Sequence, residues 1–174
     1  MSPFHGCWRG VEMKKFTASI AAALLTASLV ATPAQACWTN AEQDAARIAN
    51  MNQMLMVSAL RCRFGNDNFL NDYNRFVRQN NDVLASQHNI IKARYARTMG
   101  EKAAFEELDR FMIALSNYYG GGNGNPDCAK LAKLSNELSR VRQEASALAR
   151  LADEIVGVPR QAAHNCSVAI ASRR

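Results

Sequence analysis

The sequence predicts an all-α protein, an up-down four-helix bundle that is stapled by two disulfides and preceded by a cleaved signal peptide. Three observations lead to this fold class. Apolar residues recur every three or four positions along several segments, which is the period of an amphipathic helix. Strand-like alternation is absent, and only 7% of the residues are aromatic. Four of the five cysteines follow an export signal, and an even number of cysteines in an exported chain favours disulfides.

Residues 1–36 contain the three-part pattern of a secretory signal peptide, which begins at Met13. From Met13 the chain has two lysines, an apolar run and then small residues that end in Ala34-Gln35-Ala36, which predicts cleavage after Ala36. The residues before Met13 do not fit such a signal, so we expect the start at Met1 to be misassigned and translation to begin at Met13. The protein would then be periplasmic or secreted, and Cys7 would not belong to it.

Cys37 directly follows the predicted cleavage site, as does the lipidated cysteine of a bacterial lipoprotein. A lipoprotein signal usually has an apolar residue three positions before the cysteine and a small one two positions before it. This chain has Ala34 and Gln35 at those positions. The sequence therefore favours an unmodified Cys37 and leaves lipidation open.

Removing residues 1–36 leaves 138 of the 174 residues, which is enough for a single helical domain over residues 37–174. The number of Lys and Arg residues falls from 21 to 18 and that of Asp and Glu from 15 to 14, so the domain has a net charge of +4. This charge is too small to indicate nucleic-acid binding, but it suits a protein near anionic surfaces. No segment of the domain predicts a transmembrane helix.

The segment from Cys37 to Phe64 is expected to form the first and central helix. Thr39 and Glu42 have the spacing of a capping box, in which each side chain accepts a hydrogen bond from the other residue's backbone amide. Gly65 predicts the end of the helix, because glycine readily takes the left-handed conformation of a C-cap. An apolar stripe with one polar interruption lies between them and consists of Ala45, Ile48, Asn52, Leu55, Ala59 and Cys62.

Three more helices are predicted, at about residues 69–99, 101–119 and 126–156. Residues 80–82 have poor helix propensity, so any bend in the second helix is expected there. Gly100 is expected to separate the second helix from the third, although one continuous helix remains an alternative. The glycine-rich loop 120–125 precedes the fourth helix, which Gly157 and Pro159 end.

The number of chain reversals determines how the four remaining cysteines pair. Cys37 and Cys62 lie at opposite ends of one helix, too far apart for a disulfide. If Gly100 is a true break, Cys62 pairs with Cys128, and Cys37 pairs with Cys166. If Gly100 lies within a continuous helix, Cys37 pairs with Cys128, and Cys62 pairs with Cys166.

The candidate binding residues are cations near the end of the first helix and along the second. The structural interpretation is that their positive charges only balance the acidic residues of the third predicted helix. The functional hypothesis is that the exposed arginines bind an anionic partner such as lipid phosphate, cell-wall polymer or an acidic protein. The residues are Arg61, Arg63, Arg75, Arg78, Lys92, Arg94 and Arg97.

The sequence predicts no catalytic motif, no metal site and no cofactor. Met51, Met54 and Met56 have a spacing known from copper sites, but Met54 and Met56 would lie about 200° apart on a helix. We therefore expect these methionines to fill the core. His88 on the second helix and His164 in the tail lack the partner residues that a general base or a di-metal site requires.

The run MLMVSALRCR at residues 54–63, followed by DYNRFV at residues 72–77, resembles a group of small exported bacterial helical proteins of unknown function. The resemblance covers mainly residues 37–119 and implies no known activity. Some members are labelled S-adenosylhomocysteine hydrolase, which would imply a large NAD-binding enzyme. This chain has neither the Rossmann fingerprint nor the length for two domains, so we reject that activity.

Two hypotheses of function follow. The first is a non-enzymatic exported protein with a binding or structural role, which contacts a partner through the arginine-rich surface. The alternative is a small periplasmic enzyme with a site around His88 and nearby carboxylates.

Overall fold

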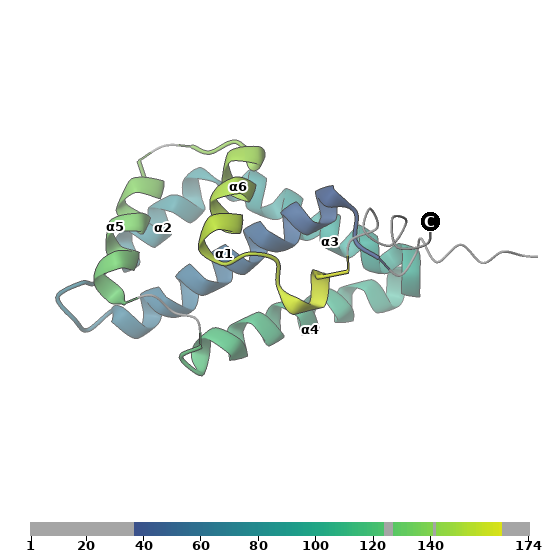
Figure 1. Cartoon of the computed structure of the whole chain (residues 1–174), viewed down its shortest axis with the longest axis horizontal. Helices are drawn as coiled ribbons and strands as arrows, with labels where there is room; N and C mark the ends of the chain where they lie inside the picture. The colour runs from purple at the N-terminus through teal and green to yellow at the C-terminus, as the bar shows by residue number, and fades with distance from the viewer. Residues whose placement is uncertain (1–36, 124–126, 141, 165–174) are drawn as a thin grey trace, which may run out of the picture. The chain divides into compact units, whose positions relative to one another are not determined.

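The computed structural model describes residues 37–123, 127–140 and 142–164, all of which lie in one unit, Thr32–Arg174. Within these residues the chain forms six α-helices and a short 3-10 helix, with no strand, so the all-α class is confirmed. The predicted signal peptide lies outside the described residues. No helix in the described part is long and apolar enough to cross a membrane. The elements are α1 (Asn40–Cys62), α2 (Leu70–Gln79), α3 (Asn81–Met99), α4 (Glu101–Gly120), α5 (Cys128–Leu138), α6 (Ala145–Ile155) and η2 (Arg160–Ala162) (Figure 1).

The helix α1 is the central element, because the other five α-helices and η2 all pack against it (Figure 1). Its predicted capping box is present. The Thr39 hydroxyl accepts from the Glu42 backbone N–H at 3.3 Å, and the Glu42 carboxylate accepts from the Thr39 N–H at 2.9 Å. The end of α1 differs from the prediction, since Gly65 does not take the left-handed conformation and Arg63 caps the helix in the α-helical region.

The second predicted helix is divided at Asn80 into α2 and α3. Asn80 is fully buried, and its side-chain amide donates to the Phe76 carbonyl oxygen at 2.9 Å. Its side-chain oxygen accepts from the backbone N–H of Gln143 at 2.8 Å. Asn80 therefore ends α2 and at the same time holds the segment between α5 and α6.

The fourth predicted helix is also divided, so the prediction of four helices is wrong. The helix α5 ends at Leu138, α6 begins at Ala145, and Gln143 lies between them. The start of this region differs as well, because Asp127 is the N-cap of α5 and its carboxylate accepts from the Lys130 N–H at 2.8 Å. The hydrogen bond from the Gln143 N–H to the Asn80 side-chain oxygen joins the breaks in the two predicted helices. It gives a partner to a backbone donor at one break and to a buried acceptor at the other.

Gly100 separates α3 from α4, so the predicted break at this residue is present. Its φ of 85° is a conformation that favours glycine. The disulfide Cys62–Cys128 is present, which excludes the crossed pairing. Cys37 is also disulfide-bonded, but Cys166 lies outside the described residues, so the pairing of these two cysteines stays a prediction. It is favoured by the backbone hydrogen bond from the Trp38 N–H to the His164 oxygen at 2.6 Å.

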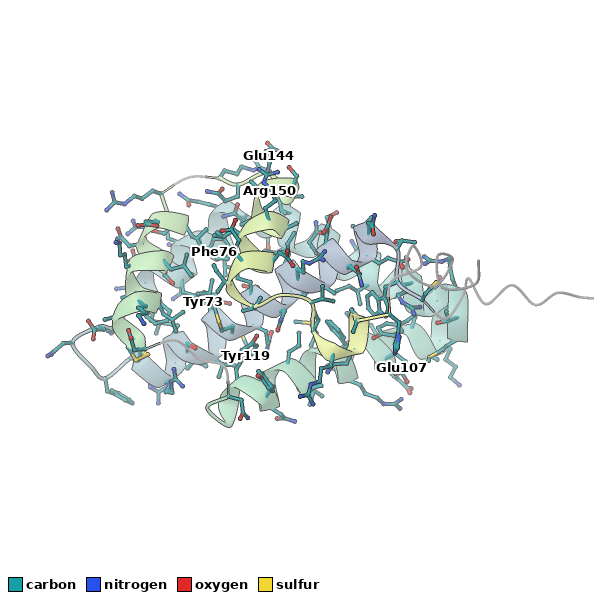
Figure 2. The ribbon with its side chains drawn as sticks, viewed as in Figure 1. Tyr73, Phe76, Glu107, Tyr119, Glu144 and Arg150 are labelled. Carbon is teal, nitrogen blue, oxygen red and sulfur yellow. A yellow bond between two sulfur atoms is a disulfide. The ribbon has the colours of Figure 1, made fainter. Side chains whose placement is uncertain are left out.

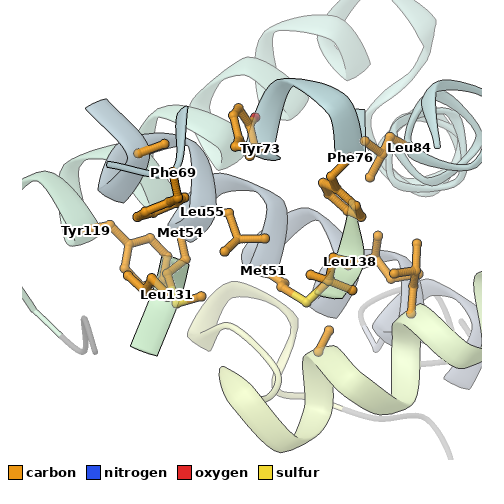
Figure 3. Packing of buried hydrophobic residues seen from close by; sticks show 14 of the residues in the cluster. Met51, Met54, Leu55, Phe69, Tyr73, Phe76, Leu84, Tyr119, Leu131 and Leu138 are labelled. Carbon is orange, nitrogen blue, oxygen red and sulfur yellow. The ribbon is translucent and has the colours of Figure 1, made fainter. Parts of the chain in front are cut away.

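Two apolar clusters lie along α1. The larger surrounds the middle of the helix and its C-terminal end, and contains Met51 and Met54, so the interpretation of these two residues as core methionines is confirmed. The smaller cluster surrounds Trp38 at the N-terminal end, with Ile91, Phe111 and small residues of α1. Figure 3 labels the larger cluster's Met51, Met54, Leu55, Phe69, Tyr73, Phe76, Leu84, Tyr119, Leu131 and Leu138.

Candidate functional site

The seven candidate cations do not form a single surface. Arg97 donates a hydrogen bond to the Glu42 carboxylate near the start of α1, whereas Arg61 lies in its last turn. A separation of 19 residues along a helix corresponds to roughly 28 Å. The cations therefore divide into a group at each end of α1 and a few on the outer faces of α2 and α3.

The cations at the N-terminal end of α1 are part of the packing. Arg94 is only 6% exposed, and its guanidinium carbon lies 4.5 Å from the centre of the Trp38 ring. Burial lowers the pKa of Arg94, while the charge of Glu42 acts in the opposite direction. The expectation that Arg94 belongs to an exposed surface is therefore wrong, and Arg97 is tied to the same carboxylate.

The cations on α2 and on the middle of α3 are separate from one another. Arg75 lies 3.7 Å from the carboxylate of Asp72 on the same helix. Arg78 is exposed and Lys92 is half-buried. These three residues carry charge on two helices without an apolar group that would define a binding site.

The C-terminal end of α1 combines exposed charge with exposed apolar surface. Leu60, Arg61, Arg63 and Phe64, here called the α1 tip, surround the buried Cys62. The Phe64 ring is 86% exposed, and the Arg63 guanidinium lies over it at 4.4 Å from the ring centre. Because Cys62 of α1 forms a disulfide with Cys128 of α5, the α1 tip is covalently linked to α5 as well as to α1.

A hollow of about 400 Å³, here called the pocket, lies between α4 and the chain that follows α6. Its wall is partly apolar and partly polar. Among the described residues, Arg160 is the only charged one that lines it. The lining residues are Asn50, Ala114, Leu115, Tyr118, Tyr119, Ile155, Val156, Val158, Pro159, Arg160 and Gln161.

Two buried amides of α1 hold one wall of the pocket, the segment 157–162, here called the strap. The Asn50 side chain donates to the Gly157 oxygen at 3.2 Å, and the Gln43 side chain donates to the Ala162 oxygen at 2.8 Å. Seven residues make nearly two helical turns, so Gln43 and Asn50 lie on the same face of α1. Gly157 has a φ of 65°, which lets the chain leave α6 toward this face.

Tyr119 of α4, which Figure 2 labels, lines the pocket together with Asn50, and the two residues form its polar floor. Its hydroxyl donates to the Asn50 side-chain oxygen at 2.8 Å. Burial raises the pKa of Tyr119 to about 12, so the phenol is neutral at physiological pH. This hydrogen bond orients the Asn50 amide so that its nitrogen faces the strap.

His88 does not line the pocket. Burial lowers its pKa. Among the described residues, neither an ion pair nor a side-chain hydrogen bond joins His88 to a carboxylate. The described part of the chain also contains no group of three or more His, Cys, Asp or Glu residues that could hold a metal ion.

The sequence analysis missed Asn50, Tyr119 and Arg160 as site residues. One signal was present, because Gln43 and Asn50 are polar residues seven positions apart on a helix that is otherwise largely buried. Large polar side chains on a buried face need hydrogen-bond partners, so this spacing indicates a crossing segment of chain. It does not indicate which segment crosses.

Comparison with protein-family models, with curated proteins and with solved structures finds no match for this chain. The chemistry of the α1 tip and of the pocket is therefore the basis for assigning a function.

Proposed function

We propose that the protein is a non-enzymatic, exported helical protein that docks through the α1 tip on an anionic membrane surface of the cell envelope. The observation that carries this proposal is the position of Phe64, which is almost fully exposed beside Arg63. Transferring a phenylalanine side chain out of water is worth about 1.5 to 3 kcal/mol. The α1 tip therefore gains free energy from any partner that covers the ring.

A membrane interface can use both kinds of group in the α1 tip. Lipid phosphates attract Arg61 and Arg63, at about 1 kcal/mol for each basic residue near an anionic surface. The interface also accepts an aromatic ring and a half-exposed leucine at the level of the headgroups. A soluble polyanion would bind the arginines without requiring Phe64.

Two further features support an envelope location. Residues 13–36 have the pattern of a signal peptide. The disulfide Cys62–Cys128 suits an oxidising compartment, and it holds the residue between the two arginines in place. The docking surface is therefore preorganised, which reduces the conformational entropy lost on binding.

Vesicle flotation tests the proposal, with vesicles of phosphatidylglycerol and phosphatidylcholine in equal parts and vesicles of phosphatidylcholine alone. We expect binding to the anionic vesicles only. Phe64→Ala should weaken it by about tenfold, and Arg63→Gln by about fivefold. Phe105→Ala is the matched control, because Phe105 is 68% exposed but lies beside Glu106 on α4.

Several outcomes would overturn the proposal. Equal binding to neutral vesicles, or equal losses for the Phe64 and Phe105 variants, would show that the α1 tip is not the docking surface. Binding to soluble polyphosphate that survives Phe64→Ala would assign the arginines to a soluble anionic partner instead of a membrane.

A further inference from the structure

We propose that the pocket is a binding site for a small organic anion, a carboxylate with a compact apolar body. This function is separate from docking through the α1 tip. Asn50 in the pocket and Arg61 in the α1 tip are 11 residues apart on one helix, which corresponds to roughly 16 Å. One protein can therefore have both sites.

The dimensions and the walls of the pocket suit a small molecule. Its volume of about 400 Å³ lies within the range of about 300 to 1,000 Å³ that is typical of ligand sites. Leu115, Ile155 and Val158 supply apolar walls, and the half-exposed Tyr118 ring stands at the rim. An apolar group of the ligand would be removed from water between these side chains.

The charge of the lining selects an anion. Within the described part of the chain, Arg160 is the only charged lining residue, and no carboxylate lies within salt-bridge distance of it. A carboxylate in the pocket would therefore complete an ion pair that the described chain does not supply. An amine would meet the same guanidinium as a like charge.

The polar floor adds a buried hydrogen-bond donor. Asn50 is 4% exposed, and one hydrogen of its side-chain nitrogen is used by the Gly157 oxygen. The second hydrogen has no acceptor among the described residues, and a carboxylate oxygen would satisfy it. Asn50 and Arg160 thus provide two donors from different elements for the same anionic group.

The pocket is also preorganised, because the strap is fixed at both ends. Asn50 holds Gly157 and Gln43 holds Ala162, and both of these hydrogen bonds come from buried side chains of α1. The residues between these anchors, which include Arg160, are therefore held beside α4 before a ligand binds. Binding of a ligand would therefore not require this segment to become ordered, and the binding free energy would not be reduced by the entropy of ordering it.

Two isosteric probes test the inference, the anion phenylacetate and its neutral amide phenylacetamide, each titrated by saturation-transfer NMR. We expect phenylacetate to bind saturably, and about tenfold more tightly than phenylacetamide. Arg160→Gln should remove this difference by weakening phenylacetate alone. Ala114→Phe should weaken both probes, because the added ring fills the pocket.

Arg150→Gln is the matched control. Arg150 is an exposed arginine of α6 that does not line the pocket and lies far from Tyr119 in Figure 2. It should leave both affinities unchanged, and thermal melting should show that every variant is folded. If Ala114→Phe does not fold, the Arg160 and Arg150 pair still decides the result.

The proposal fails if phenylacetate shows no saturable binding or binds no more tightly than phenylacetamide. It also fails if the Arg160 and Arg150 variants lose the same affinity. Neither of these results depends on vesicle binding, so the pocket and the α1 tip are tested separately.

Discussion

The two ends of α1 each hold an arginine against an aromatic ring, at nearly the same distance but in opposite environments. Arg94 lies 4.5 Å from the centre of the Trp38 ring, which is 3% exposed and packs against Tyr95 and Phe111. Arg63 lies 4.4 Å from the centre of the Phe64 ring, and Phe64 is 86% exposed. The contact geometry therefore does not distinguish a structural arginine from one that can bind a partner, and burial does.

The largest difference between the two ends should appear when the rings are removed. Trp38→Ala should lower the free energy of unfolding by about 3 to 5 kcal/mol, because it empties the centre of the smaller cluster. Phe64→Ala should change it by less than about 0.5 kcal/mol. Urea denaturation measures both, and similar losses would show that Phe64 is also covered in the folded protein.

The disulfide at the α1 tip should have an effect of similar size. Replacing both Cys62 and Cys128 with alanine opens a loop with a sequence separation of 66 residues, and the chain-entropy model assigns this loop up to about 4 kcal/mol. The same variant should weaken vesicle binding, because Arg61 and Arg63 are then less ordered. Unchanged denaturation would mean that the C-terminal end of α1 is held by packing alone.

Substitutions of Arg94 and Arg63 should show the same difference between the two ends of α1, with smaller changes in the free energy of unfolding. Arg94→Gln should cost about 1 to 2 kcal/mol of stability, since it removes a buried contact with Trp38 and a charge that faces Glu42. Arg63→Gln should cost less than about 0.5 kcal/mol but weaken vesicle binding. The reverse order of stabilities would contradict the assignment of Arg94 to the packing and of Arg63 to the docking surface.

The sequence predicted the start of α1, the break at Gly100 and one disulfide, but it missed the C-cap of α1 and the breaks that depend on distant groups. The capping box of Thr39 and Glu42, the break at Gly100 and the pairing of Cys62 with Cys128 follow from short-range patterns and chain reversal. The break near Gln143 does not. Arg142, Gln143 and Glu144 are good helix formers, so the break depends on the Asn80 side chain, 63 residues away, which accepts the Gln143 N–H.

For the candidate sites too, the sequence predicted local features and missed contacts between distant residues. Composition and helical spacing identified the basic residues, including Arg61 and Arg63. They did not show that Trp38 covers Arg94, because this contact joins residues 56 positions apart. The pocket could not be predicted either, since the strap reaches α1 through hydrogen bonds to Gln43 and Asn50 that span more than 100 residues.

Among the buried residues, the smallest loss of stability is predicted for Tyr119 of α4, which contacts Asn50 between the two ends of α1. Burial raises its pKa from 10.0 in the unfolded chain to about 12, so its contribution to stability is present below pH 10 and is lost as the pH rises to about 12. Tyr119→Phe should lose about 1 kcal/mol at neutral pH with the hydrogen bond to Asn50. It should then lose less stability than the parent protein between pH 10 and pH 12 in thermal melts. Parallel losses in the two proteins would show that the phenol ionises freely in the folded state.

The central claim, that only the exposed end of α1 meets a membrane, is tested most directly by an indole at each exposed phenylalanine. Phe64→Trp and Phe105→Trp are prepared separately in the chain that begins at Cys37, and the signal of Trp38 in the parent protein is subtracted. With phosphatidylglycerol vesicles, we expect the indole at position 64 to shift to the blue and to be quenched by brominated lipid. The indole at position 105 should show neither change. Quenching at position 105 alone, or at neither position, would contradict docking through the α1 tip.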